Sequence, residues 1–160
     1  MITTLVTTNV SKYIHPLTKE VAIEVASNLL PEDRNELEEG HGLDPQEALV
    51  QSVSSGASFA FLMPDGNWAA AGGVDPFNGI WLLCTPHIHS HPITFTRQCK
   101  RFIEHRPEKY LWNIADKRNT VHLKLLRFLG FKFLREIEYG PNKLSFIEFC
   151  RVQPYSVHGR

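Results

Sequence analysis

The sequence predicts a single α+β domain in which a mixed, mostly antiparallel sheet carries helices on both faces. The chain has 160 residues, of which 42% are hydrophobic and 21% charged, values that suit one core. Three closely spaced strand patterns follow an N-terminal helical region. Helical patterns then flank one further strand and lead to a terminal hairpin. We assign residues 1–152 to the domain and residues 153–160 to a polar tail.

The N-terminal third is predicted to be mainly helical. A short strand is expected at residues 3–8, which are rich in Thr and Val. Residues 16–30 are expected to form a helix, because apolar side chains recur there every four residues. Pro31 ends that helix, and residues 32–39 form a short acidic helix or turn. Asp44 caps the next helix, which runs to about residue 54.

The remaining two thirds combine strand and helix patterns. The expected strands are residues 57–63, 68–74, 79–84, 110–114, 131–138 and 144–152. A helix at residues 93–106 is long enough to join residues 80–84 to 110–114 as parallel neighbours. Asn119 caps a last helix that Gly130 closes. Its expected apolar stripe is Val121, Leu125, Phe128 and Leu129.

Composition excludes several classes of protein. Lys plus Arg and Asp plus Glu both number 17, so the net charge is zero, which argues against a nucleic-acid partner. No apolar run reaches the ~20 residues of a membrane span, so no membrane partner is expected. The segment from Met1 to Asn9 lacks a signal-peptide pattern. Cys84, Cys99 and Cys150 are odd in number and form no CxxC pair, which indicates neither disulfides nor structural zinc.

Three histidines, His87, His89 and His91, alternate between a predicted strand and a predicted helix. In an extended segment the three imidazoles would share one side. They could then bind a metal ion, act as a base or contact a substrate. A solvated polar loop is the other interpretation. We favour the loop and predict no metal site.

Acidic side chains give further candidates. Asp33, Glu36 and Glu39 could line an amine-binding groove, because acidic groups attract cationic substrates, or they could form a solvated face. Asp75 and Asp116 lie at strand ends, where both functional sites and turns place Asp.

Residues 119–131, Asn-Thr-Val-His-Leu-Lys-Leu-Leu-Arg-Phe-Leu-Gly-Phe, resemble a segment of the GNAT (N-acetyltransferase) fold. In that segment Asn begins a helix that ends in Leu-Gly-Phe and leads into a strand. Other segments resemble a family of short-tailed phages related to internal virion protein A. They are residues 31–38, 44–49, 65–66, 71–74, 81–85, 91–92 and Arg97. The resemblance covers about residues 1–150 and implies a GNAT-like fold, virion or host protein partners, and the cytoplasm of an infected bacterium or the assembling particle.

The resemblance also implies where acetyl-CoA would bind. In the GNAT pattern a glycine-rich loop follows the strand matching residues 80–84 and holds the pyrophosphate with backbone N–H groups. The implied cofactor contacts are Cys84, Thr85, Ser90, Ile93 and Asn119. Residues 85–92, however, contain two prolines and no glycine, and proline has no N–H. The Tyr that acts as general acid in many GNAT enzymes, seven residues after the capping Asn, is replaced here by Leu126.

Two functions therefore remain open. One is a GNAT-fold protein with a degenerate acetyl-CoA site that acts in virion assembly or host interaction. The other is an acetyl-CoA-dependent N-acetyltransferase acting on a host or phage amine, for which fold resemblance is the warrant. The missing glycine loop and general acid favour the first, so we expect acetyl-CoA to bind weakly or not at all. The candidate catalytic residues are His87, His89, His91 and Asn119, and Asn119 is also interpreted as a plain helix cap.

Overall fold

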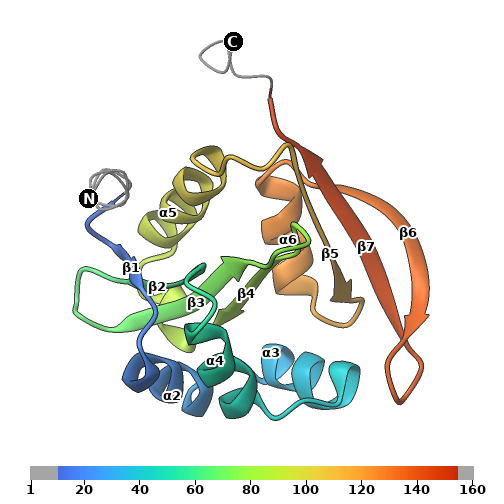
Figure 1. Cartoon of the computed structure of the whole chain (residues 1–160), viewed down its shortest axis with the longest axis horizontal. Coiled ribbons are helices and arrows are strands. Elements are labelled where there is room, and N and C mark those ends of the chain that lie inside the picture. Colours follow the sequence, from blue (N-terminus) through green and yellow to red (C-terminus); the bar gives the residue numbers. More distant parts are fainter. Residues whose placement is uncertain (1–10, 155–160) are drawn as a thin grey trace.

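The computed structural model describes residues 11–154, which form two antiparallel sheets with helices packed on them (Figure 1). The first sheet has four strands in the order β1-β2-β3-β4, and the second has three in the order β5-β7-β6. The strands of the first sheet are β1 (Ile14–Pro16), β2 (Ser58–Leu62), β3 (Trp68–Val74) and β4 (Ile80–Cys84). Those of the second are β5 (Tyr110–Asp116), β6 (Lys132–Tyr139) and β7 (Leu144–Val152). The strand expected at residues 3–8 lies outside the described residues.

Helices cover both faces of the first sheet, as the sequence predicts. On one face lie α2 (Lys19–Ser27) and α4 (Pro45–Val53), and on the other lies α5 (Pro92–Glu104) (Figure 1). Helix α6 (Thr120–Phe128) lies between α5 and the second sheet. The middle strand β3 carries only Ala and Gly at residues 69–73, all of them buried, which lets the helices approach its backbone closely. No helix within residues 11–154 is both long and apolar enough to cross a bilayer.

The N-terminal helix is shorter than predicted. Residues Ile14–Pro16 pair with β2, and the Thr18 side chain caps α2 by accepting a hydrogen bond from the Val21 N–H. Pro31 does not end the preceding helix, which stops at Ser27. It begins α3 (Pro31–Asn35), where its missing N–H is harmless. Helix α3 continues as a π-helix, η1 (Glu36–His41). We call α3 and η1 together the acidic segment.

The predicted helix caps are confirmed, but the predicted stripe of α6 is partly wrong. Asp44 accepts a hydrogen bond from the Glu47 N–H at 2.9 Å, and Gly130 adopts the left-handed conformation with φ 88°. Val121 and Phe128, expected inside, are 44% and 64% exposed. The helix instead buries Leu126, because its core-facing side is rotated by about one residue from the predicted stripe.

The expected parallel pair of β4 and β5 is reduced to a single bridge between Gly79 and Trp112, where both strands begin. There the Trp112 N–H donates to the Asn78 carbonyl at 3.1 Å, and the Asn113 amide donates to the Ile80 carbonyl at 2.9 Å. Beyond this point the strands run in the same direction but splay apart (Figure 1). The expected parallel neighbours are therefore found at this bridge, while the strands beyond it belong to separate sheets. At the end of β4 the backbone of Cys84 bonds to Leu30 and Asp33 instead of β5.

Candidate functional site

The site lies where β4 and β5 splay, and the outer edge of β4 is its first component. The Thr85 N–H donates to Ala69 on β3, so the alternation of the antiparallel ladder turns the backbone groups of Cys84 and Leu82 away from β3. A ligand held between the strands would pair with these groups, as an added strand pairs with a free sheet edge.

The acidic segment already occupies the Cys84 position. The Cys84 N–H donates to Asp33 Oδ2 at 2.7 Å, and the Cys84 carbonyl accepts from the Leu30 N–H at 2.9 Å. Asp33 is only 4% exposed. Both backbone groups of Cys84 that face the splay are therefore satisfied within the chain.

The same carboxylate reaches the other side of the splay. The Asn119 side-chain amide donates to Asp33 Oδ1 at 2.7 Å, while Asn119 Oδ1 caps α6 by accepting from the His122 N–H. Asp33 thus joins the end of β4 to the beginning of α6. The predicted capping role of Asn119 is confirmed, and its amide is committed to Asp33.

Glu36, one turn further along the acidic segment, contacts β5. Its Oε1 accepts from the Asp116 N–H at 2.9 Å. The buried Asp116 carboxylate in turn binds Arg118, which also contacts Glu39 at 2.8 Å. Of the three predicted acids, Asp33 and Glu36 hold strand ends, and Glu39 forms a surface ion pair. The i, i+3 spacing of Asp33 and Glu36 was the sequence signal that both face one way.

Burial raises the pKa of both Asp33 and Glu36 above the values of free carboxyls. Desolvation of the charged form is the largest cause for each, and nearby His122 acts in the opposite direction. At Asp116 burial also acts to raise the pKa, but hydrogen bonds from Arg118 outweigh it and lower the pKa. The splay therefore holds two carboxyls with raised pKa values beside an imidazole.

A groove of about 400 Å³ lies between β4 and β5 on the side of the acidic segment, and we call it the splay groove. Its lining is mostly apolar. Its titratable side chains are Glu36, His41, Asp75 and His122. His41 Nδ1 is hydrogen-bonded to the Tyr139 hydroxyl at 3.1 Å, and burial lowers the His41 pKa. Of the acids expected to line a groove, Glu36 does so, and Asp75, expected only at a strand end, lines it too. His41 and His122 were missed because no motif marks them.

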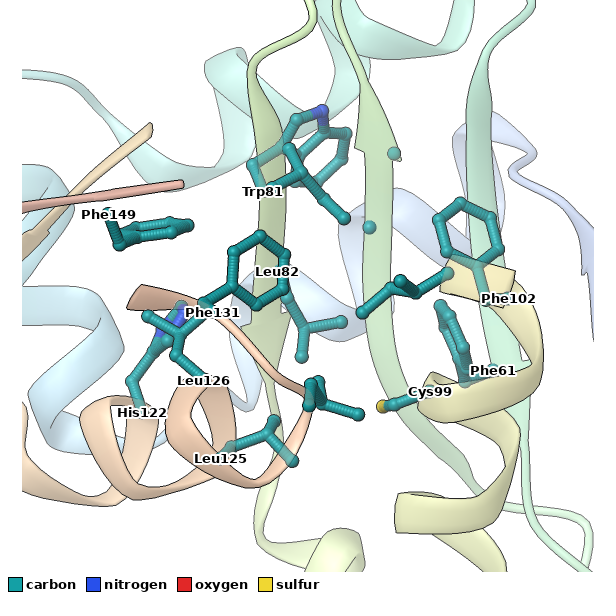
Figure 2. Close-up of a pocket in the computed structure, with 15 residues that line it drawn as sticks. Phe61, Trp81, Leu82, Cys99, Phe102, His122, Leu125, Leu126, Phe131 and Phe149 are labelled. Atoms are coloured by element: carbon teal, nitrogen blue, oxygen red, sulfur yellow. The ribbon is translucent and has the colours of Figure 1, made fainter. Parts of the chain in front are cut away.

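The opposite side of the splay is filled. A cavity of only about 40 Å³ remains between α5 and α6, lined by apolar side chains such as Leu82, Leu126 and Phe131 (Figure 2). Ligand pockets measure about 300–1,000 Å³, so this cavity has no room for a cofactor. Phe149 and His122 line both the cavity and the splay groove and separate the two spaces.

Of the expected cofactor contacts, Cys84 and Asn119 both bond to Asp33. Cys84 and Thr85 are buried, and the Thr85 hydroxyl donates to the Trp68 carbonyl at 2.8 Å. Ser90 and Ile93 are exposed at the start of α5, with Ile93 72% exposed. Leu126, in the position of the general acid, is 5% exposed and packs in the cavity. These residues do not fit acetyl-CoA bound in the way the GNAT pattern implies.

The histidine segment is not extended, so the alternating arrangement that would line up the three imidazoles does not form. Pro86–His89 forms a 3₁₀ helix, η2, because Pro86 starts it and the Thr85 hydroxyl caps it by accepting from the His87 N–H at 3.3 Å. His91 Nε2 lies 3.4 Å from Asp65 Oδ2 on the β2–β3 turn. Hydrogen bonding to Asn67 lowers the pKa of the Asp65 carboxyl, and nearby His91 and His87 act in the same direction. Within residues 11–154 no cluster of His, Cys, Asp and Glu suits a metal ion.

Comparison with solved structures shows the GNAT fold. A GNAT-family acetyltransferase from Bacillus anthracis superposes with a TM-score of 0.65 at 8% identity, over 87% of this chain and 93% of that one. A ribosomal L7/L12 α-N-protein acetyltransferase solved with coenzyme A gives 0.60 at 11% identity, over 90% and 96%. A Vibrio cholerae spermidine N-acetyltransferase gives 0.60 at 10% identity, over 88% and 92%. No protein-family model matches the sequence, and no curated protein matches it.

The raised carboxyl pKa values predict a pH dependence of stability. A raised pKa means that the folded state binds the proton more tightly than the unfolded state. The contribution of these two carboxyls to the free energy of unfolding is therefore fully present in acid and is lost as pH rises from about 4 through their raised pKa values. Glu36→Gln keeps an acceptor for the Asp116 N–H but cannot ionise. We expect its stability relative to the native protein to increase with pH, measured by urea unfolding from about pH 5 to pH 8.

The matched control is Glu38→Gln, which changes an exposed neighbour on the same segment. Its stability should follow the native curve at every pH, within about 0.5 kcal/mol. A constant difference between Glu36→Gln and the native protein over the whole range would contradict the assignment of Glu36 as a carboxyl with a raised pKa.

Proposed function

We propose that this chain is a GNAT-fold protein that does not use acetyl-CoA and acts by binding other proteins, in virion assembly or in contact with host proteins. The observation that carries the proposal is the Asp33–Cys84 hydrogen bond, which satisfies the Cys84 N–H at the end of β4 within the chain. The acidic segment takes the place that an extended ligand would occupy in the splay.

Energetics support this proposal. An acetyl-CoA molecule entering between β4 and β5 would first have to displace Asp33 from both Cys84 and Asn119. Hydrogen bonds to a charged group contribute about 1.5–3 kcal/mol each. Micromolar affinity requires about −8 kcal/mol, so losing both bonds would consume much of it. Residues 85–92 offer no compensating row of backbone N–H groups, since their helix η2 begins at Pro86.

The proposed partners are virion or host proteins, and the proposed location is the cytoplasm of an infected bacterium or the assembling particle. The sequence segments that resemble the phage family support this choice. The zero net charge supports a protein partner over nucleic acid. The structural likenesses bear on the fold and not on the partner.

Calorimetry with acetyl-CoA tests the proposal. We expect no binding in the micromolar range at pH 8. Micromolar affinity at pH 8 would overturn the proposal.

An N-acetyltransferase is the second candidate, and one observation favours it beyond the fold. Glu36 and His122 line the splay groove, and the raised pKa of Glu36 suits a general base that takes a proton from an amine. Release of CoA from acetyl-CoA, measured with spermidine or a peptide N-terminus as acceptor, tests this function. Turnover that Glu36→Gln abolishes would establish it, and no turnover with either amine would favour the binding role.

A further inference from the structure

A cluster of exposed aromatic side chains lies where the two sheets meet. Phe77, at the β3–β4 turn, is 78% exposed, and Tyr110, at the start of β5, is 46% exposed. Together with Pro76, Asn78 and Trp112 they line a shallow depression of about 590 Å³. We call Pro76, Phe77, Tyr110 and Trp112 the aromatic patch. Large apolar side chains this exposed are typical of interaction sites when they occur together.

Hydrogen bonds hold the aromatic patch rigid. Asp75 Oδ1 accepts from the N–H groups of Phe77 and Gly79, each at 2.8 Å, which fixes the turn that presents the Phe77 ring. The Trp112 indole N–H donates to the Phe77 carbonyl at 2.8 Å. A partner that binds here would not have to order the turn, and such preorganisation favours affinity.

The aromatic patch continues into the splay groove. Alternation along β5 places Tyr110, Trp112 and Ile114 on one face, since Leu111 and Ala115 between them are buried in the core. Ile114 lines the groove and Trp112 the depression. Asp75 lines the groove and directly precedes Pro76 of the patch. The aromatic patch and the splay groove therefore form one continuous surface along β5, which we call the track.

The charge of this track favours a cationic ligand. The exposed Asp75 carboxylate stands at the junction of depression and groove, and Glu36 lies further in. The facing titratable groups in the groove are His41 and His122, and burial keeps the His41 pKa low. A Lys or Arg side chain next to an apolar one would match the carboxylate and the rings together.

We propose that this track binds an extended segment of a partner protein that carries a Lys or Arg close to an aromatic residue. The aromatic residue packs on Phe77, Tyr110 and Trp112, and the cationic side chain lies against Asp75. The inference rests on the proposed protein-binding function and names its surface and partner chemistry. It requires no reaction and no cofactor.

The test is a titration of the full-length, ¹⁵N-labelled protein with blocked tripeptides, followed by amide chemical shifts. We expect acetyl-Lys-Gly-Phe-amide to shift the amides of residues 75–79 and 110–114. Acetyl-Glu-Gly-Phe-amide should bind about five-fold more weakly, as expected for roughly 1 kcal/mol of charge interaction. Equal affinity for both peptides, or shifts elsewhere, would overturn the proposal. Shifts of the same amides on dilution without peptide would identify a second copy as the occupant and also overturn it.

Three variants sharpen the test. Phe77→Ser should abolish the shifts for both peptides. Asp75→Asn keeps an acceptor for the turn but removes the charge, so it should abolish the preference for Lys over Glu. Phe128→Ser, a 64% exposed position on α6 outside the track, should change neither. Acetyl-CoA is added to the same sample, and the Cys84 amide shift then tests the proposed function. The peptide-induced shifts at residues 75–79 and 110–114 test this inference, so the two failures are distinguishable.

Discussion

Replacing Asp33 with Ala is expected to lower the free energy of unfolding by about 3 kcal/mol. Two buried donors, the Cys84 N–H and the Asn119 amide, would lose their acceptor, and an unsatisfied buried donor costs about 1–3 kcal/mol. The desolvation that raises the Asp33 pKa offsets part of this, since the charge itself is unfavourable in the fold. Urea unfolding with a constant m-value measures the change.

The matched control is Glu32→Ala, an exposed acid on the same helix. It should change stability by no more than about 0.5 kcal/mol. A loss in Asp33→Ala as small as that of the control would mean that Asp33 does not hold the ends of β4 and α6 together. Local hydrogen exchange should locate the effect, with the Cys84 amide exchanging faster in Asp33→Ala.

Replacing Gly140 with Ala is expected to destabilise the protein by about 3 kcal/mol. Gly140, in the β6–β7 turn, has φ 80°, and a Cβ there would lie 1.9 Å from the Gly40 carbonyl oxygen of the π-helix η1. Left-handed backbone costs about 1–2 kcal/mol in a non-glycine residue, and the overlap adds about 1–3 kcal/mol. The turn and the acidic segment would have to move apart.

Gly66→Ala separates these two contributions. Gly66 has a similar φ of 83° but nothing within 4 Å of an added Cβ. It should therefore show only the backbone contribution, about 1 kcal/mol by urea unfolding. Equal losses of stability in the two variants would mean that the β6–β7 turn does not pack tightly on η1. The turn would then not help to hold the acidic segment in place.

The sequence predicted the elements of this fold better than their pairing. Strand periodicity and caps located β2 to β7 and the start of α6, because these signals are local. The reduction of the β4–β5 pair to one bridge was not predictable, since it depends on Asp33 and Glu36 reaching strand ends about 50 and 80 residues away. The sequence analysis named both acids as candidates but not the backbone groups that they contact.

The candidate site was predicted in part. The missing glycines and Leu126 pointed to a degenerate cofactor site, and the acids of residues 32–39 were recognised as candidates. The histidines drew attention through their alternation, but Pro86 and the Thr85 hydroxyl start a 3₁₀ helix that contains His87 and His89, and His91 precedes α5. Phe77 and Tyr110 were not singled out, because nothing in a strand pattern distinguishes an exposed aromatic ring from a buried one.

We propose that the acidic segment takes the place of a cofactor between β4 and β5. The most direct test is an amide chemical-shift titration with acetyl-CoA up to millimolar concentration. We predict that the amide signals of Cys84 and Asp116, which donate to Asp33 and Glu36, stay unchanged throughout. Saturable shifts of these two signals, accompanied by shifts of Leu82 on the open edge of β4, would contradict it.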